Sequence, residues 1–263
     1  MGPLVSIVMP VFNAEKFILE SIDSVINQKY FNWELIIVDD CSADGTMDLV
    51  NIRLEYESRI SLFQLDSNQG VAFCRNKAIS SANGRFISFL DSDDLWEAEK
   101  LEKQVNFMLN NDFHFTYTAY KKIDHNGQIN GQVGVPARLS YNDLLKTCYI
   151  GCLTAMYDSE KLGKVYMPSD TKREDYATWL NILKDTDYAY GINECLASYR
   201  VHPSQSSSKK INMAFENFLL YRKEERGWGR TVYYFINYAF RGYLRTKLPR
   251  LAILLGVLHK PKS

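Results

Sequence analysis

The chain has 263 residues, of which 46% are hydrophobic and 24% charged, so its composition is that of a globular protein and argues against global disorder. This length allows one large α/β domain, alone or with a C-terminal appendage. The formal net charge is zero, which gives no general reason to expect nucleic-acid binding.

The first 91 residues alternate between short apolar runs and amphipathic segments. The amphipathic segments predict helices at 17–28, 44–58 and 71–81, and Asn13 is expected to cap the first of these helices. Strands and helices that alternate in this way form a mainly parallel sheet with helices on both faces. The apolar runs predict strands at Ser6–Met9, Trp33–Val38, Ile60–Leu65 and Phe86–Leu90.

Polar residues follow each of these predicted strands. In a parallel sheet the carboxyl ends of the strands meet at one edge, and ligands bind beyond that edge. Packing alone does not explain four polar clusters at one edge, so the pattern predicts a ligand site there. The clusters are Asn13, Asp39-Asp40, Asn68-Gln69-Gly70 and Asp91-Ser92-Asp93-Asp94.

The second half of the chain is less regular. Asn126-Gly127 is typical of a hairpin turn, and residues 204–210 form a polar loop. Helices are predicted at Glu97–Asn110, Tyr141–Lys146, Glu174–Lys184 and Asn212–Glu225, and strands at Phe113–Ile123, Cys152–Tyr157 and Leu196–Val201.

The five cysteines are widely spaced and odd in number, which predicts free thiols in a reducing compartment. The N-terminus lacks the basic segment of a secretory signal. The longest apolar run, Leu251–Leu258, has eight residues, whereas a membrane-spanning helix needs about 18. We therefore expect a cytoplasmic protein that attaches to the cytoplasmic face of the inner membrane without crossing it.

The run Asp91-Ser92-Asp93-Asp94 has the pattern of a site for a divalent cation. Carboxylates two residues apart at a strand end can address one hard cation, whose other ligands are phosphate and water oxygens. An acidic loop that caps the following helix is the alternative, and the same alternative applies to Asp39-Asp40. A response-regulator receiver would place its paired acids after the first strand, but here that strand ends at Pro10-Val11-Phe12-Asn13.

Together, these motifs resemble family 2 glycosyltransferases of the bacterial surface-polysaccharide type. The resemblance resumes at Arg173-Glu174-Asp175-Tyr176 and at Tyr199-Arg200-Val201-His202. It implies an α/β protein of the GT-A (Rossmann-like) fold, with a mixed, mainly parallel sheet and helices on both faces. Residues 1–210 would form the catalytic domain, divided into a nucleotide-binding half (1–95) and an acceptor-binding half (96–210). Residues 211–263 would form a helical, aromatic and basic extension.

The resemblance also implies roles in binding a UDP-sugar donor. The backbone at Pro10 and Val11, near Asn13, would hold the base together with Asp39 or Asp40, since a carboxylate accepts from the imide N–H of uracil. We slightly favour Asp39 over Asp40. The remaining donor-binding residues would be Gly70, Arg75, Asp91, Ser92, Arg200 and His202. A surface ion pair is the alternative for Arg75, and an ordinary surface histidine is the alternative for His202.

The metal implied by the resemblance is Mn²⁺ or Mg²⁺, ligated by Asp93, and His202 would reach either the metal or the diphosphate. Asp94 would either add to this site or only cap the helix that follows. Inverting transfer is a single displacement that needs charge neutralisation at the leaving diphosphate and a proton acceptor on the opposite side of the sugar. By resemblance Asp175 is this base, with Glu174 beside it. Acids that merely occupy a helix N-terminus are the alternative. Trp179 would either stack on an acceptor sugar or lie in the core.

Residues 222–263 hold ten Lys or Arg and two Asp or Glu, a net charge of +8, so residues 1–221 carry −8. Between 228 and 258 the basic residues are interleaved with Trp, Tyr and Phe, which suits an anionic membrane surface and not nucleic acid. A lipid-linked acceptor, carried on polyprenyl diphosphate or lipid A, would explain that location. Packing on the catalytic domain and a homodimer contact are the alternatives for this tail.

The sequence thus predicts metal-dependent transfer of a single hexose during synthesis of O-antigen, lipooligosaccharide or capsule. The Gln-x-x-Arg-Trp motif of processive synthases is absent, which favours single addition. A sugar nucleotidyltransferase is one alternative, although it would carry a Gly-rich, basic loop after the first strand. A nucleotide-sugar-binding module without turnover is another, although its acids at 91, 93 and 175 would then be unnecessary.

Overall fold

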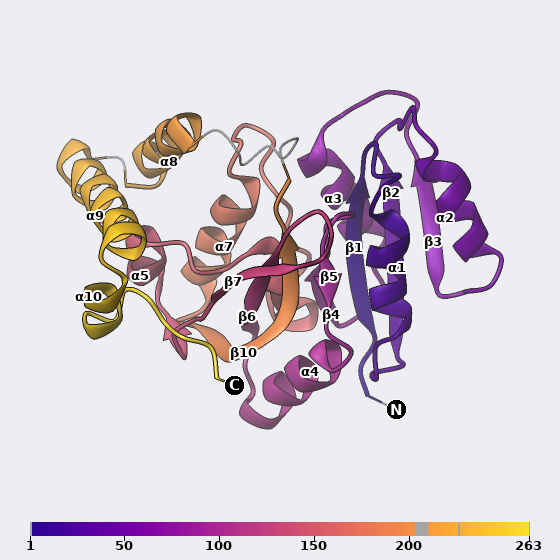
Figure 1. Cartoon of the computed structure of the whole chain (residues 1–263), viewed down its shortest axis with the longest axis horizontal. Coiled ribbons are helices and arrows are strands. Elements are labelled where there is room, and N and C mark those ends of the chain that lie inside the picture. The colour runs from indigo at the N-terminus through magenta and orange to yellow at the C-terminus, as the bar shows by residue number, and fades with distance from the viewer. Residues whose placement is uncertain (1, 203–209, 226, 263) are drawn as a thin grey trace.

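The computed structural model describes residues 2–202, 210–225 and 227–262, so Ser204 and Ser206 of the polar loop lie outside the described residues. Its centre is one sheet with the strand order β3-β2-β1-β4-β9-β6-β10-β5, in which β7 pairs with β6 and β8 with β10. Helices cover both faces of this sheet, and three C-terminal helices lie at one end of it (Figure 1). This is the mixed, mainly parallel α/β architecture that the sequence predicts.

The first half of the chain forms the regular part of the sheet. Strand β1 lies between β2 and β4, β3 pairs with β2, and all of these pairs are parallel. The carboxyl ends of the four strands therefore share one edge, as predicted. The strands are β1 (Val5–Val11), β2 (Trp33–Asp39), β3 (Ile60–Gln64) and β4 (Phe86–Phe89), and the helices are α1 (Ile18–Ile26), α2 (Thr46–Leu54) and α3 (Val71–Ser81).

Two hydrophobic layers lie on opposite faces of the sheet, because successive side chains of a strand point to opposite sides. On β1, Ile7 and Met9 face the layer formed with α1, α2 and α4, whereas Val8 faces the layer formed with α3, α5 and α7. Trp179 lies at the centre of the second layer, fully buried against Phe89 and Phe115 at ring-centroid distances of 5.4 Å. It is therefore a core residue and not a platform for an acceptor sugar.

The second half adds strands in mixed directions. Strand β9 is antiparallel to both β4 and β6, so β6 runs parallel to β4. The predicted hairpin at Asn126-Gly127 is confirmed, since β6 and β7 pair antiparallel. The elements are β5 (Leu95–Trp96), α4 (Lys100–Asn111), β6 (Phe115–Ile123), β7 (Ile129–Val133), β8 (Arg138–Leu139), α5 (Tyr141–Lys146), the 3₁₀ turn η1 (Cys152–Thr154), β9 (Met156–Asp158), α6 (Ser159–Leu162), α7 (Glu174–Asp185) and β10 (Ala189–Arg200).

Several predictions in this half were wrong in extent. The strand expected at Cys152–Tyr157 is a 3₁₀ turn followed by the short β9, because Thr154 folds back to donate from its N–H and hydroxyl groups to the carbonyl of Gly151. Strand β10 begins at Ala189, seven residues before the predicted start at Leu196. Its early part has no apolar alternation and is fixed by pairing with β6, which a local pattern does not report.

The C-terminal helices are α8 (Lys210–Glu225), α9 (Trp228–Lys247) and α10 (Pro249–Leu254). Helices α8 and α9 pack on α5 and α7, and α10 packs on α9. Tyr234 donates a hydrogen bond to Asn142 at 2.8 Å, and Tyr149 donates to the carbonyl of Val257 at 2.9 Å. The tail thus packs on the domain, which was one of the alternatives left open. Among the described residues, no helix is long and apolar enough to cross a membrane.

Candidate active site

Asn13 joins the loops after β1 and β2. It has a left-handed φ of 48°, which asparagine tolerates, and its side-chain oxygen accepts from the N–H of Ala43 at 2.9 Å. Its own N–H donates to Ser42 Oγ at 2.9 Å. The expectation that Asn13 caps the following helix was wrong: α1 begins at Ile18 without a side-chain cap. Asn13 instead shapes the rim beside Pro10 and Val11, the end of β1.

The paired aspartates after β2 are buried and hold different loops. Asp39 accepts from the N–H and the hydroxyl of Ser42 at 3.1 and 2.5 Å. Asp40 accepts from the N–H groups of Gln69 and Gly70 at 2.6 and 2.9 Å. Gly70 has a φ of +88°, which an L side chain rarely adopts, so glycine is needed where this loop turns into α3. Both oxygens of Asp39 bond Ser42 and both oxygens of Asp40 bond the loop at Gln69, so each aspartate anchors one of the loops around the predicted base site.

Arg75 is buried and connects the acidic loop after β4 to the helix that carries the predicted base. Its Nη2 lies 2.6 Å from Asp91 and its Nη1 lies 2.9 Å from Glu174. Burial opposes the charge of Arg75, but these carboxylates hold its pKa well above the usual value. The surface ion pair considered from the sequence is therefore wrong, since the guanidinium is a buried link between the two halves of the site.

The neighbours Glu174 and Asp175 have different environments at the start of α7. Glu174 is bound to Arg75, and its pKa is raised by burial and by the negative charge of Asp175, against the opposing charge of Arg75. Among the described residues, the only hydrogen bond of the Asp175 carboxylate is the one it accepts from the N–H of Tyr176 at 2.7 Å. Asp175 is thus the acid of the pair that is not held by a cation, as a proton acceptor requires.

The four residues after β4 divide their contacts among different elements. Asp91 bonds Arg75, and the carbonyl of Ser92 accepts from Ser21 on α1 at 2.9 Å. Asp94 is buried, which raises its pKa well above the usual value, and it accepts from the N–H of Arg200 at 2.9 Å. Asp94 therefore fastens the loop to β10, and the expectation that it caps the next helix was wrong.

Arg200 supports this loop from the end of β10. Its guanidinium is buried, donates to the carbonyl of Asp93 at 2.8 Å and pairs with Glu20 at 2.7 Å. The sequence placed Arg200 among the donor-binding residues, whereas these contacts suit a role in positioning Asp93. Glu20 was missed because no local pattern connects two residues 180 positions apart.

Asp93 and His202 are brought together at the open end of the loop. Asp93 Oδ2 lies 2.8 Å from His202 Nε2, and the ring of His202 packs against Phe17 at 5.4 Å. No cluster of three or more His, Cys, Asp or Glu side chains suited to a metal occurs within the described part of the chain. One carboxylate and one imidazole nevertheless fit Mn²⁺ or Mg²⁺ when diphosphate and water supply the other ligands.

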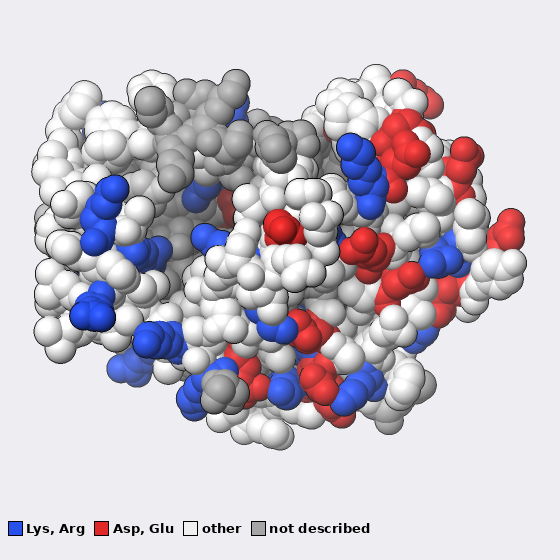
Figure 2. Space-filling view, viewed as in Figure 1, with Lys and Arg blue, Asp and Glu red and all other residues white. Residues whose placement is uncertain are grey.

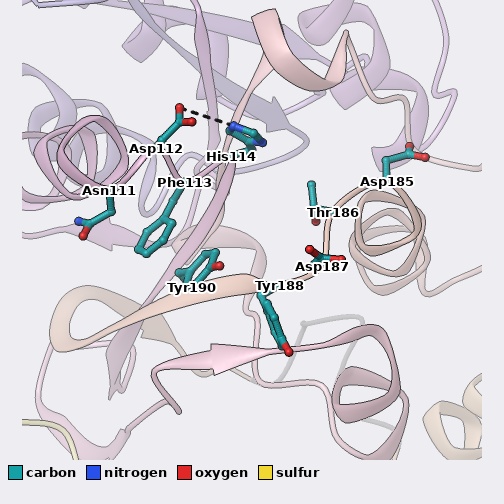
Figure 3. A pocket seen from close by; sticks show the side chains of 9 residues that line it. All are labelled: Asn111, Asp112, Phe113, His114, Asp185, Thr186, Asp187, Tyr188 and Tyr190. Carbon is teal, nitrogen blue, oxygen red and sulfur yellow. Dashed lines mark ion pairs between the residues drawn. The ribbon is translucent and has the colours of Figure 1, made fainter.

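A pocket in the described structure lies away from these residues. It has a volume of about 420 Å³ and is lined by residues 111–114, 185–188 and Tyr190 (Figure 3). These residues precede β6 or lie at the start of β10, which runs parallel to β6. Because β6 is parallel to β4, the pocket is at the edge of the sheet opposite the acidic loop.

Known proteins resemble this chain over the part that contains the four polar clusters. A profile of the family "Glycosyl transferase family 2" matches residues 6–159. TuaG of Bacillus subtilis (strain 168), a glycosyltransferase assigned provisionally to teichuronic acid biosynthesis, is 42% identical over 90% of this chain and 95% of its own. WfgD of Escherichia coli is also 42% identical, over 91% of this chain and 93% of its own; its name describes a UDP-Glc:α-D-GlcNAc-diphosphoundecaprenol β-1,3-glucosyltransferase.

Solved structures share the fold at low sequence identity. TarS of S. aureus, residues 1–349 in complex with UDP-GlcNAc, matches with a TM-score of 0.70 and 20% identity, over 98% of this chain and 79% of that chain. The mannosyltransferase PcManGT of Pyrobaculum calidifontis, in complex with GDP-Man and Mn²⁺, matches with a TM-score of 0.68 and 18% identity, over 97% and 79% of the respective chains.

Proposed function

The chain belongs to glycosyl transferase family 2, and on that premise we propose that it transfers a single hexose, with inversion, from a UDP-sugar to a lipid-linked saccharide of a bacterial surface glycan. The observation that carries the proposal is the buried Asp91–Arg75–Glu174 network. Through it, the loop that presents Asp93 and the helix that presents Asp175 are held in one arrangement, as a single displacement with a base and a leaving group requires.

In the proposed reaction Asp175 accepts the proton of the acceptor hydroxyl as that oxygen attacks the anomeric carbon. Asp93 and His202 would hold Mn²⁺ or Mg²⁺, which neutralises charge on the departing diphosphate. Asp39 would read the base, and Gly70 lets the backbone approach the donor without a side chain. Arg75 keeps Asp91 and Glu174 in place, so it positions the loop that presents Asp93 and the helix that presents Asp175.

For the substrates, we take the relatives' names as the guide. WfgD and WfaP of Escherichia coli are both named for transfer from UDP-Glc to α-D-GlcNAc-diphosphoundecaprenol, and WfaP is 37% identical over 79% of this chain. We therefore propose UDP-glucose as the donor and an N-acetylglucosaminyl diphosphate lipid as the acceptor, in preference to a lipid A-linked saccharide.

We also propose that α9 and α10 dock on the cytoplasmic face of the membrane that holds this acceptor. The outer face of α9 is apolar and exposed, with Val232, Ile236, Phe240 and Tyr243 each 43–59% accessible. Lys and Arg lie over the C-terminal helices in Figure 2, while Asp and Glu gather over the N-terminal half on the other side. Apolar area beside basic side chains favours an anionic lipid surface.

A donor screen with the purified protein tests the enzymatic proposal. With Mn²⁺ and a short-chain N-acetylglucosaminyl diphosphate lipid, we expect UDP release from UDP-glucose and its loss with a chelator. Asp93→Ala should abolish transfer, whereas Asp112→Ala, which removes an exposed carboxylate at the opposite edge of the sheet, should not. Full activity of Asp93→Ala would contradict the metal assignment. Pyrophosphate release from a nucleoside triphosphate would favour a nucleotidyltransferase, and tight UDP binding without turnover a binding module.

A further inference from the structure

Two arginines, Arg173 close to the predicted base in sequence and Arg245 on α9, have buried N–H groups with no acceptor among the described residues. Arg173 Nε and Arg245 Nη2 are inaccessible to solvent and have no hydrogen-bond partner among the described residues. Buried donors are nearly always paired, and an unpaired one lowers the stability of the fold. Arg222 has a similar group, but its guanidinium packs on Trp228 at the corner between α8 and α9. Arg75 Nε is also buried without a partner, although the other two nitrogens of that group pair with Asp91 and Glu174. Arg173 and Arg245 differ from Arg75 because they form no ion pair among the described residues.

The surrounding structure holds both guanidinium groups in place. Arg245 Nε donates to the carbonyl of Val257 at 3.0 Å, and its guanidinium lies 4.4 Å from the ring centre of Tyr149. Arg173 directly precedes α7 and lies 5.5 Å from the ring centre of Tyr176. Side chains fixed in this way lose little further freedom when a ligand binds. Both arginines are only partly buried, so an anion can reach each guanidinium group from its exposed side.

The two arginines and Asp175 all act electrostatically on one side chain, the half-buried thiol of Cys148. Burial raises the pKa of Cys148 to about 12; the negative charge of Asp175 adds to this, and the positive charges of Arg173 and Arg245 oppose it. Arg75 instead interacts with Asp91 and Glu174. At the start of α7, Glu174 is thus bound to Arg75 on the donor side, whereas Arg173 and Asp175 act with Arg245 on Cys148, on the side that we assign to the acceptor.

We propose that Arg173 and Arg245 bind the diphosphate of the acceptor. This rests on the proposed function, in which the acceptor is one sugar joined to a lipid through a diphosphate. In such an acceptor the attacking hydroxyl and the diphosphate are attached to the same sugar ring. The cations that bind the diphosphate must therefore lie about the width of one sugar ring from the base that accepts the hydroxyl proton. Arg173, two positions before Asp175, meets this requirement, and guanidinium groups match phosphate oxygens in charge and geometry.

The lipid chain leaves this site toward α9. Arg245 is on the same helix as the exposed apolar residues Ile236 and Phe240, but on the side that packs against Tyr149. Figure 2 shows the molecular surface hollowed between the C-terminal helices and the centre of the molecule, with basic side chains around the hollow. A diphosphate held there connects a sugar at Asp175 with a chain lying on the membrane.

The test compares two soluble acceptors, a short-chain N-acetylglucosaminyl diphosphate lipid and an N-acetylglucosamine glycoside with an uncharged alkyl chain. For Arg173→Gln and Arg245→Gln we expect the KM of the diphosphate acceptor to rise about tenfold or more, with little change in kcat. The KM values of the uncharged acceptor and of UDP-glucose should stay the same. Lys172→Gln removes the same charge from the exposed residue next to Arg173 and should have no effect. Arg245→Lys, which keeps the charge, should restore part of the affinity.

The outcomes distinguish a role in acceptor binding from a structural role and from a role in donor binding. An equal rise in KM for both acceptors would mean that the arginines support the fold, and a rise for UDP-glucose alone would mean that they serve the donor diphosphate; either result overturns the assignment. An unchanged KM in both variants overturns it as well. If the wild-type protein transfers to neither acceptor, the proposed function fails and the assignment fails with it. UDP binding and the melting temperature of each variant identify a loss of folding.

Discussion

The donor half and the acceptor half of the site are built in different ways. On the donor side, neighbouring loops bind each other through main-chain groups, as Asp40 does with Gln69 and Gly70. On the acceptor side, Asp175 and Arg173 start a helix whose surroundings come from α5 and the C-terminal helices. The donor side pairs its cation, Arg75, with two carboxylates, whereas Arg173 and Arg245 on the acceptor side form no ion pair among the described residues.

This difference matches what each half would bind. A nucleotide diphosphate is common to many donors, so loops that are fully bonded to each other can receive it in a fixed position. The acceptor differs from one enzyme to another. The acceptor half consists of the mixed strands β5–β10 and the C-terminal helices, whose connecting loops can vary between proteins. Substitutions in the two halves should therefore affect different steps.

Asp175→Asn should have the largest effect. Removal of the base is expected to lower kcat by about 10²- to 10⁴-fold. Among the described residues, Asp175 forms no hydrogen bond or ion pair with Arg75, Asp91 or Glu174, so UDP binding measured by calorimetry should persist. A variant that still turned over would place the base elsewhere, and one that lost UDP affinity would show that the two halves are not separable in this way.

Arg75→Gln should cost stability as well as activity. Loss of the buried cation leaves Asp91 and Glu174 facing each other, and breaking such a pair costs about 3–5 kcal/mol of unfolding free energy. Arg85→Gln is a suitable comparison, since Arg85 also pairs with a buried carboxylate, Asp158, but lies away from the site. Urea unfolding of both variants, with transfer assays, separates the effects. A site that keeps full activity in Arg75→Gln would contradict the proposed link between the halves.

The double variant Ile236→Ser/Phe240→Ser should act only on the membrane step. Each side chain contributes about 1.5 kcal/mol or more when fully buried in an apolar phase, so binding to anionic vesicles should fall roughly 100-fold. Turnover of a soluble acceptor should stay at the wild-type level. Undiminished vesicle sedimentation would refute the docking surface, and a change from dimer to monomer in light scattering would assign this face to a second copy of the chain.

Lys100→Met should have the smallest effect on activity, since Lys100 lies in the core between α4 and β4 and away from the site. It lies on α4, is fully buried and reaches Ser88 on β4 at 3.2 Å. Burial lowers its pKa well below the usual value, so above that pKa the unfolded chain binds the additional proton. Up to pH 10.5, stability relative to Lys100→Met should rise by up to about 1.4 kcal/mol per pH unit. Urea unfolding at several pH values measures this difference, and a pH-independent difference would mean that Lys100 is charged in the fold.

Much of the donor half followed from sequence. Helix α3 occupies the predicted residues 71–81, and the four polar clusters share one edge because parallel strands end on the same side. The helix cap expected from Asn13 was wrong because a single short side chain can serve several local contacts with similar energies, and the neighbouring loop at Ser42 decided among them.

The sequence by itself determined the family, the alternating architecture and the residue types of the site, because these depend on periodicity and on motifs within short stretches. Only the tertiary structure decided that Arg75 is a buried link, that Glu174 and Asp175 face different partners, and that Trp179 is a core residue. It also packed Arg245 of α9 against Tyr149, the neighbour of Cys148. Contacts across 70 or more positions depend on how helices pack on the sheet, and that packing is a property of the whole chain.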